Sequence, residues 1–344
     1  MIEKVCLNHT TSPTVNPVEP GYQSAPMNRR SFLKTTTITA AAASLPMAVT
    51  QAAHHKNAAP FKISLAQWSL NKRFFKREGH LPLDHLDFAR VARSFGIDGI
   101  EYVNQFFKDK SKDKTYLKEM IQRADGEGVT SLLIMVDGEG MIGDPDSNKR
   151  SQTVENHLKW LDAAATLDCH SIRVNAGSKG TFAEQQKLAA DGLRRLSEAG
   201  DKAGINVIVE NHGGLSSNGK WLSGVMDRVD HDRCGTLPDF GNFIIDRTTG
   251  ERYDIYQGME DLMPHAKAVS AKAYDWAVDP DPNVCVEQRA GREAKVDFKR
   301  ILEIVLKHGY HGYIGIEYEG SYQEEMQGVA MTKAVMDRLK DELA

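Results

Sequence analysis

From residue 61 onward, the chain alternates between short apolar runs and longer stretches in which apolar residues recur every three or four positions. The recurring pattern, as in Phe298, Ile301 and Ile304, is typical of helices that bury one face. The short runs end in polar residues and are bounded by Gly, Asn or Asp, as strands are. Eight such runs occur, at residues 63–68, 99–103, 131–136, 171–174, 206–209, 235–237, 268–271 and 313–316.

Strands that alternate with helices form parallel sheets, and eight such units in one domain close into a barrel. We therefore expect a single-domain α/β protein with a (β/α)8 TIM-barrel fold. An open, doubly wound sheet is the competing arrangement, but it usually has a glycine-rich phosphate-binding turn after its first strand. The sequence after the first run, WSLNK at 68–72, is not such a turn.

The first fifty residues have a different pattern. Residues 27–34, MNRRSFLK, place paired arginines before a weakly apolar run at 35–49, which resembles a twin-arginine export signal with a cleavage site at 50–53. An Arg-bearing amphipathic helix is disfavoured, because residues 35–43 lack polar periodicity. We expect residues 1–26 to be an upstream extension, 27–53 the signal peptide and 54–344 the barrel, which makes the mature protein periplasmic or otherwise exported.

Charge and cysteine content limit the partners. The formal net charge is −4, so there is no basic surplus to neutralise a nucleic acid. After the signal, no run of about 18 apolar residues is present to anchor the chain in a membrane. The remaining cysteines, Cys169, Cys234 and Cys285, are widely spaced, which supports neither a disulfide framework nor a zinc motif.

Polar residues follow every apolar run, at the end of the barrel where active sites are assembled. Strand alternation puts Glu317 and Glu319 on one side and groups Glu210 with His212. Carboxylates of Glu210, Asp239 and Glu317 that converge there would repel one another unless a cation lies between them. The polar residues are Gln67 and Ser69, Glu101 and Asn104, Asp137 and Glu139, Arg173 and Asn175, Glu210 and His212, Asp239 and Asn242, Lys272 and Asp275, and Glu317 and Glu319.

Each of these residues also has an ordinary interpretation. A single Glu after a strand is often a solvated loop residue, Asp239 lies in a Pro-Asp-Phe-Gly-Asn sequence that favours turns, and His212 precedes two glycines. Their coincidence at equivalent strand ends favours a functional site.

Six motifs carry a resemblance to a known family. In order and spacing they resemble the xylose isomerase-like TIM barrels, over residues 61–340. That family includes sugar-phosphate isomerases and epimerases, ketose 3-epimerases, inosose dehydratases and apurinic endonucleases. The motifs are GIDGIEY (96–102), SIRVNAG (171–177), VIVENHGG (207–214), LPDFGNF (237–243), AVSAKAYDW (268–276) and YIGIEYEG (313–320).

The resemblance implies a divalent cation, Mn, Mg or Zn, held by Glu210, Asp239 and Glu317. The position of the family's histidine ligand is taken by Lys272, and an ammonium group cannot ligate a metal. Three arrangements follow. Three carboxylates and water hold the metal, His212 replaces the missing ligand, or the Lys272 ammonium replaces the charge of the metal.

The implied reaction is removal of a proton next to a sugar carbonyl, through an enediolate, by an isomerase or epimerase. The resemblance makes Glu210 and Glu317 the proton acceptor and donor, and His212 and Lys272 further catalytic groups. Phe107 and Trp276 are candidates for stacking on a sugar, although both are equally typical of packing. The expected substrate-binding residues are Trp68, Glu101, Arg173, Asn175, Asp275 and Arg289.

Other functions fit the same residues. An enediolate can instead expel a leaving group from the β carbon, as in an exported 3-keto-glycoside lyase. The Lys272 departure is compatible with a non-catalytic carbohydrate-binding barrel. An apurinic endonuclease is disfavoured, because it needs additional histidine ligands and because export removes the DNA. The expected partner is a small carbohydrate, with no nucleic acid and no stable membrane anchor, and the resemblance implies a homodimer or homotetramer.

Overall fold

The computed structural model of the protein describes residues 59–289 and 292–344. The expected export signal, its cleavage site and the upstream extension lie outside the described residues. Within the described ranges, the eight apolar runs all form strands of a single parallel sheet. The TIM-barrel prediction is therefore confirmed.

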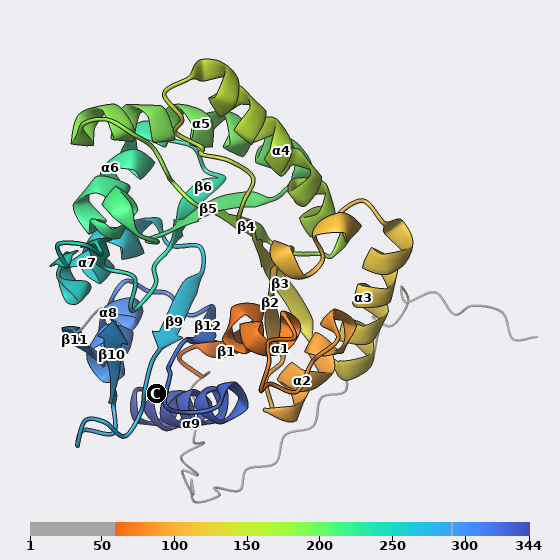
Figure 1. The fold of residues 1–344 in the computed structure, drawn as a ribbon, viewed down its shortest axis with the longest axis vertical. Coiled ribbons are helices and arrows are strands. Elements are labelled where there is room, and N and C mark those ends of the chain that lie inside the picture. The colour runs from red at the N-terminus through yellow and green to blue at the C-terminus, as the bar shows by residue number, and fades with distance from the viewer. Residues whose placement is uncertain (1–58, 290–291) are drawn as a thin grey trace, which may run out of the picture. The chain divides into compact units, whose positions relative to one another are not determined.

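The sheet is ordered β6-β5-β4-β3-β2-β1-β12-β9 and curls round an axis (Figure 1). Its two end strands are joined through the isolated bridges Thr236↔Ala266 and Asp239↔Ser270, which close the barrel. The strands are β1 (Lys62–Ala66), β2 (Gly99–Val103), β3 (Thr130–Met135), β4 (Ser171–Val174), β5 (Asn206–Glu210), β6 (Cys234–Leu237), β9 (Val269–Ala273) and β12 (Tyr313–Tyr318).

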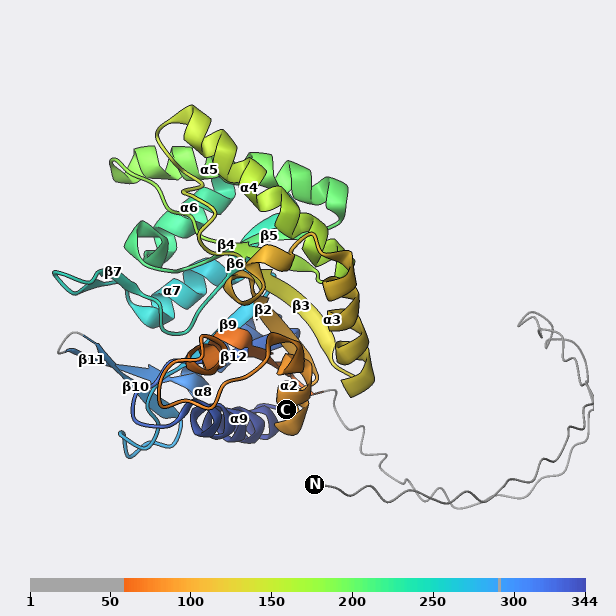
Figure 2. The same ribbon diagram turned by 45° about the vertical axis from the view of Figure 1, so that its right-hand side comes forward.

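Helices surround the strands, as Figures 1 and 2 show. Most begin at a side chain that accepts a hydrogen bond from a backbone N–H of the first turn, such as Asp146 before α4 or Thr181 before α5. The helices are α1 (Asn71–Phe74), α2 (Phe88–Ser94), α3 (Lys114–Glu127), α4 (Ser147–Thr166), α5 (Phe182–Ala203), α6 (Gly219–Val229), α7 (Ile255–Leu262), α8 (Phe298–Lys307) and α9 (Glu325–Glu342).

In the part of the chain that the structure describes, two antiparallel hairpins interrupt the strand–helix alternation, and neither is among the elements expected from the sequence. The first pairs β7 (Ile244–Asp246) with β8 (Glu251–Arg252) and follows β6, and the second pairs β10 (Val284–Arg289) with β11 (Arg292–Asp297) and follows β9. An ion pair joins them, with Arg252 Nη1 2.8 Å from Glu287 Oε2. Figure 2 shows both hairpins projecting on the same side of the domain.

The core has two parts because successive side chains of a strand point to opposite faces. The larger part lies between the strands and the helices and includes Trp160, Trp221 and Phe298. A separate, smaller cluster comprises inward-facing residues such as Ala66, Val103, Leu133 and Ile208. Apolar side chains therefore fill part of the barrel interior, next to the inward-facing polar residues of the neighbouring strands.

Gly192 in α5 provides a test of this packing. A Cβ at this position would overlap with the carbonyl oxygen of Ile142, in the segment that follows β3. We expect Gly192→Ala to lower the free energy of unfolding by about 1–3 kcal/mol, as overpacking does. Gly126 in α3 is the matched control, because a Cβ there has nothing within 4 Å. Gly126→Ala should raise the stability by about 0.5–1 kcal/mol, and denaturant unfolding of both variants measures the opposite signs.

His85 provides a pH test of the fold. Its ring stacks on Phe107 and its Nδ1 lies 2.9 Å from the Tyr116 hydroxyl. Burial lowers the pKa of His85 from 6.5 to about 4, although Asp84 partly opposes the shift. Between these values the unfolded chain binds a proton that the folded protein does not. This residue should therefore make the free energy of unfolding fall by about 1.4 kcal/mol per pH unit as the pH drops from 6.5 to 4.

His85→Gln keeps a hydrogen-bond acceptor for Tyr116 and removes the titrating group. The difference in unfolding free energy between pH 7 and pH 5 should therefore shrink in this variant. An unchanged difference would show that His85 does not take up its proton in this way.

Candidate active site

A lysine ammonium lies among four carboxylates at the carboxyl ends of the strands. Lys272 Nζ is 3.0 Å from Glu317 Oε1, 3.5 Å from Glu319 Oε1, and 3.8 Å from both Glu210 Oε1 and Asp239 Oδ2. The lysine side chain is 1% exposed, so the cluster is shielded from bulk water. The expected convergence of Glu210, Asp239 and Glu317 is therefore present.

Strand register explains this convergence. Lys272 on β9 pairs with Glu317 on β12 in the parallel ladder, so neighbouring strands present both side chains to the interior at the same height. Ser270 lies two positions before Lys272 on the same face. Its Oγ donates to Asp239 Oδ2 over 2.8 Å and contacts Glu317 Oε2 at 3.3 Å. Ser270 thus fixes two carboxylates at the seam that closes the barrel.

The loop after β6 orients the remaining oxygens. Asp239 Oδ1 accepts hydrogen bonds from the backbone N–H groups of Gly241 and Asn242. The Asn242 side chain donates to Glu210 Oε1 over 2.8 Å, and Asn211 accepts from the Asp239 N–H. The turn predicted from the sequence PDFGN is present. Its backbone N–H groups hold the carboxylate of Asp239 within the acidic cluster.

Arg173 forms the opposite wall of the cluster. Its Nε lies 2.9 Å from Glu210 Oε2, and its Nη1 lies 2.7 Å from Asp137 Oδ1. Asn175 also donates to Asp137 Oδ1, over 2.7 Å. Burial raises the pKa of Asp137, but Arg173 and the hydrogen bonds outweigh it, and the pKa is held below its usual range. Arg173 is thus a second fixed cation beside Glu210.

The charges of the cluster influence one another. Burial raises the pKa of Glu317 and of Asp239 above the usual value, and the nearby Glu210 adds to both shifts while Lys272 opposes them. Burial also acts upward on the pKa of Glu210, but Arg173, His212 and Lys272 outweigh it and hold that pKa low. The carboxylates raise the pKa of Lys272 well above its usual value despite burial. Lys272 is thus cationic and Glu210 anionic at neutral pH.

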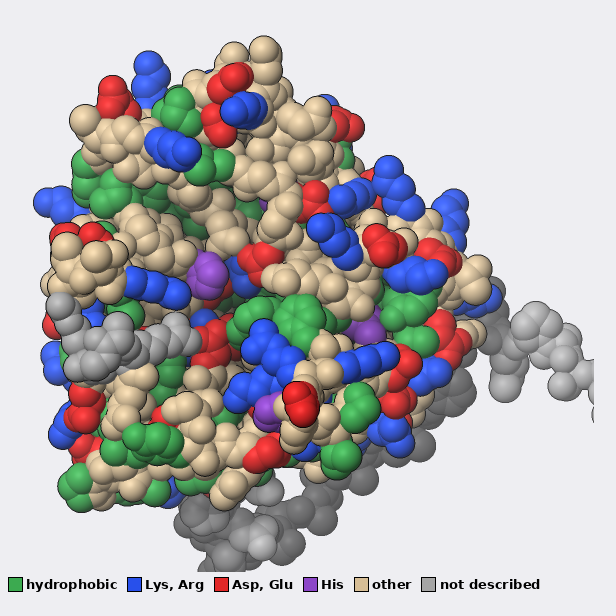
Figure 3. Space-filling model, viewed as in Figure 1, with side chains coloured by type: hydrophobic (Ala, Val, Ile, Leu, Met, Phe, Trp, Pro, Cys, Tyr) green, Lys and Arg blue, Asp and Glu red, His purple; other side chains and the backbone are tan. Residues whose placement is uncertain are grey.

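Aromatic side chains border the acidic cluster. Trp68 Nε1 donates to Glu319 Oε1 over 2.7 Å, and its ring lies 6.0 Å from Phe75 and 6.3 Å from Phe106, measured between centroids. Phe75 is 39% exposed. Figure 3 shows hydrophobic side chains gathered in the middle of this face, next to acidic, basic and histidine side chains. The site therefore combines a charged interior with an apolar rim that includes Trp68.

Other predicted residues lie elsewhere. Glu101 is buried inside the barrel, where it accepts a hydrogen bond from Ser64, and burial raises its pKa to about 7. Phe107 and Trp276 are each 3% exposed, and the Trp276 side chain donates to Thr332. Both are therefore core packing residues, which is the alternative to sugar stacking given above.

Asp275 has a structural position. Its Oδ1 accepts hydrogen bonds from the backbone N–H groups of Ser321 and Tyr322, and its Oδ2 accepts one from the Ser321 hydroxyl. Both oxygens thus hold the segment after β12. Arg289 is the last residue of β10, and the structure describes its backbone pairing with Arg292.

His212 is exposed beside the site. Glu210 acts to raise its pKa, but desolvation and the cations Arg173 and Lys272 outweigh that effect and lower it. At this site, the ligand atoms that lie within 4.8 Å of one another belong to Glu210, Asp239 and Glu317, without His212. A role of His212 as the replacement ligand therefore has no support in this geometry.

Ser270 and Glu319 are not among the catalytic, substrate-binding or metal-binding residues expected from the sequence. Ser270 has the same parity as Lys272, which is the signal that places it in the site. Strand alternation predicts only that Glu319 shares a face with Glu317. In the structure its Oε1 accepts hydrogen bonds from Lys272 and Trp68.

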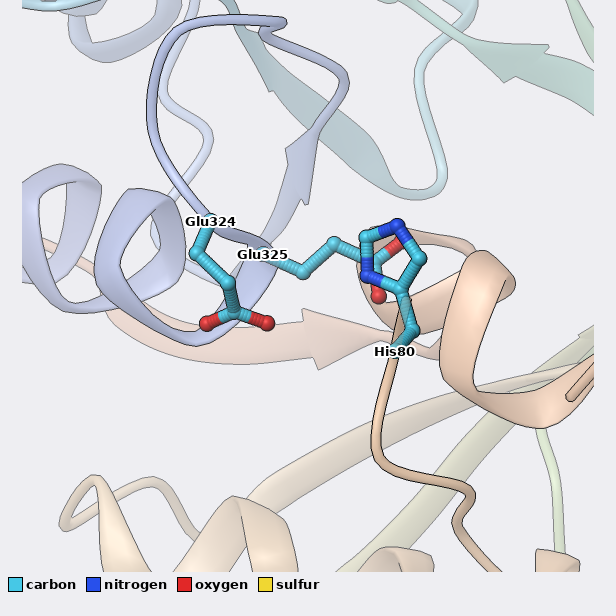
Figure 4. A group of neighbouring side chains, drawn as sticks. All are labelled: His80, Glu324 and Glu325. Carbon is cyan, nitrogen blue, oxygen red and sulfur yellow. The ribbon is translucent and has the colours of Figure 1, made fainter. Parts of the chain in front are cut away.

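A second group of potential ligands lies at the start of α9. Figure 4 shows the side chains of Glu325 and His80 converging, with Glu324 beside them. Glu324 caps the helix and accepts two hydrogen bonds from Arg73, while Glu325 accepts from the Lys72 N–H. A helix N-terminus favours negative charge, and Arg73 already supplies a cation. These residues therefore anchor α9 to the segment after β1.

Comparison with known families decides the relationship of the chain. The model of the xylose isomerase-like TIM barrels matches residues 89–342. The chain belongs to this family. The model of the twin-arginine translocation signal matches residues 26–46, which indicates export. Within the described ranges, none of the helices combines the length and apolar character needed to cross a membrane. The comparison with curated protein sequences returned no match.

Solved structures share the fold of this xylose isomerase-like barrel at low sequence identity. The apo 3-keto-D-glucoside 4-epimerase YcjR from E. coli is 16% identical, with a TM-score of 0.57 over 82% of this chain and 99% of that chain. A xylose isomerase-like TIM barrel protein from Mycobacterium smegmatis in complex with magnesium is 15% identical, with a TM-score of 0.59 over 83% and 98%. D-psicose 3-epimerase from Clostridium cellulolyticum H10, with D-tagatose, is 13% identical, with a TM-score of 0.58 over 82% and 99%.

The resemblance implies a divalent metal, and three residues of this barrel suit one. Glu210, Asp239 and Glu317 each present an oxygen within 4.8 Å of the others, and carboxylates ligate Mg and Mn. This group by itself can bind a metal ion. Lys272 does not suit one, because its ammonium lies at the point where the three carboxylates converge and would repel a second cation. The complete set of residues therefore does not fit a resident divalent ion.

The structural position of Asp275 yields a prediction. Replacing a buried acceptor of several hydrogen bonds leaves its donors unpaired, so Asp275→Ala should lower the free energy of unfolding by about 2–3 kcal/mol. Denaturant unfolding measures this loss, with the exposed Asp109→Ala as the control. If Asp275→Ala instead keeps wild-type stability, its carboxylate does not hold the segment after β12.

Proposed function

We propose that this protein is a sugar isomerase or epimerase that moves a proton on the carbon next to a carbonyl group. The observation that carries the proposal is the pair of carboxylates, Glu210 and Glu317, that both lie within 3.8 Å of a fixed cation at the carboxyl ends of the strands. A carboxylate can accept a carbon-bound proton, and a positioned cation stabilises the negative charge that develops on the carbonyl oxygen. Membership of the family and the likeness to epimerase folds support this reaction class.

The two carboxylates have different surroundings, which suits different roles. Glu210 is held by Arg173 and Asn242, and its low pKa keeps it ionised and able to accept a proton. Glu317 contacts Lys272 and Ser270, and its raised pKa lets it keep a proton to higher pH. In the proposed reaction, Glu210 takes the proton while the C–H electron pair moves into the enediolate. Glu317 then delivers a proton to carbon.

The cations Lys272 and Arg173 bind and polarise the substrate in this proposal. Their N–H groups hydrogen-bond to the oxygens of the enediolate, where the negative charge collects. Trp68 and Phe106 provide an apolar surface against one face of a sugar ring. An export signal favours a sugar without a phosphate group, because phosphorylated sugars are intracellular intermediates.

The finer identity of the substrate is part of the proposal. One similar fold belongs to a 3-keto-D-glucoside 4-epimerase and another to a D-psicose 3-epimerase, so keto sugars and keto glycosides are the compounds to test. A 3-keto-glycoside also permits a second outcome, in which the enediolate expels the aglycone and the protein is a lyase. The exposed Phe75 beside Trp68 favours a substrate with an apolar substituent.

Solvent exchange tests the proposal directly. Keto sugars and 3-keto-glycosides are incubated with the mature protein in D2O, and NMR follows deuterium entering the carbon next to the carbonyl. We expect exchange with at least one compound, and a loss of about 10²–10⁴-fold in rate for Glu210→Gln and for Glu317→Gln. Glu303→Gln, on the exposed face of α8, is the matched control and should keep the wild-type rate.

The outcomes separate the alternatives. Exchange with release of the aglycone identifies a lyase, and exchange with a new sugar stereoisomer identifies an isomerase or epimerase. Saturable binding of a sugar without any exchange would favour the non-catalytic carbohydrate-binding barrel. Exchange that survives both Glu→Gln substitutions would refute the assignment of the two carboxylates.

A further inference from the structure

We propose that the Lys272 ammonium is a built-in cation that takes the place of a divalent metal in this barrel, so that the site works without bound metal. The inference rests on the proposed function for its catalytic meaning. Its structural content, that the carboxylate group already holds its cation, is tested separately by metal binding.

The position of the nitrogen is the first support. Lys272 Nζ lies within 3.8 Å of an oxygen from each of Glu210, Asp239 and Glu317, and it also contacts Glu319 at 3.5 Å. A metal ion bound by the three carboxylates would have to enter the same space. Because an ammonium group has no lone pair, it cannot join the ligands of such an ion.

Burial of the lysine is the second support. A surface lysine can swing away from a cluster, but the Lys272 side chain is 1% exposed and its strand neighbours Ala271 and Ala273 are fully buried. Strand alternation directs the lysine stem into the barrel at the height of Glu317, its partner in the ladder. The cation is thus part of the covalent chain and is fixed by the register of β9 and β12.

Charge balance is the third support. Buried carboxylates at this spacing repel one another and need a compensating positive charge. Arg173 compensates Glu210 and Asp137 on one side. On the other side Lys272 supplies the charge for Glu317, Glu319 and Asp239. A divalent ion would add a cation next to one already present.

The substitution changes how a substrate oxygen is held. A metal would ligate that oxygen directly, whereas an ammonium donates hydrogen bonds in defined directions. Lys272 Nζ forms an ion pair with Glu317 at 3.0 Å and donates a hydrogen bond to Glu319 over 3.5 Å. Glu210 and Asp239, at 3.8 Å, lie beyond hydrogen-bond distance, so neither takes up the third donor. That donor is the one we assign to the carbonyl oxygen of the sugar.

Metal content and calorimetry test the inference. The wild-type protein, Lys272→Met and Lys272→His are each treated with chelator, incubated with Mn²⁺ or Zn²⁺, and freed of unbound metal. Elemental analysis then counts the ions per chain, and calorimetry measures the affinity for Mn²⁺. Lys118→His, on the exposed face of α3, controls for the addition of an imidazole elsewhere.

We expect the wild type and Lys118→His to retain less than about one ion per ten chains and Lys272→His to retain about one ion per chain. Removing the ammonium frees the carboxylates, and the imidazole adds a neutral nitrogen ligand. Lys272→Met should bind Mn²⁺ more weakly than Lys272→His but more tightly than the wild type. Circular dichroism shows whether the variants fold.

About one ion per chain in the wild type, or a rise in its melting temperature on addition of Mn²⁺, would overturn the inference even if both Lys272 variants fail to fold. Folded Lys272 variants that bind no more metal than the wild type would also contradict it. The proposed function fails separately, if a metal-free wild type exchanges no deuterium into any keto sugar. If it does exchange deuterium, its rate should be unchanged by a chelator.

Discussion

The site depends on one electrostatic constraint, which is that carboxylates gathered in a buried barrel mouth must share a cation. The fold brings Glu210, Asp239, Glu317 and Glu319 together, because parallel strands all end at the same face. Without a positive charge among them, these groups would take up protons or separate. The register of β9 and β12 supplies that charge from Lys272, and the remaining hydrogen bonds of the site are arranged around it.

The same constraint links the cations to the chemistry. Arg173 contacts one oxygen of Glu210 and Lys272 lies near the other, and together they hold the pKa of Glu210 low. Burial, aided by the neighbouring acids, raises the pKa of Glu317 although Lys272 opposes the shift. Two carboxylates of one residue type thereby acquire unlike properties from their neighbours. Such a pair suits the proton transfer proposed above.

The sequence predicted residues on strands better than residues in loops. Alternation along a strand fixes the direction of a side chain, so Glu210 and Glu317 converge inside the barrel as the sequence predicts. Lys272, expected only from its place after an apolar run, joins them. Asp275 and Trp276 lie beyond the end of β9, where the path of the backbone decides the direction of each side chain. Asp275 accepts from the N–H of Ser321, and Trp276 donates to Thr332. Alternation does not indicate how far along the barrel axis a side chain lies. Glu101 therefore points inward as expected, but it is buried against Ser64 inside the barrel. The hairpin of β10 and β11 had a signal, since Val284 and Val286 alternate with other residues before Gly291.

Part of the acid cluster lies where the barrel closes, between the two strands with the fewest backbone contacts. Seven neighbouring strand pairs form ladders, whereas β6 and β9 meet through two bridges, one of which joins Asp239 to Ser270. The hydrogen bond between the side chains of those two residues thus belongs to the acid cluster and also helps to close the barrel. A substitution of Asp239 or Ser270 would therefore disturb the acid cluster and the closure of the barrel together.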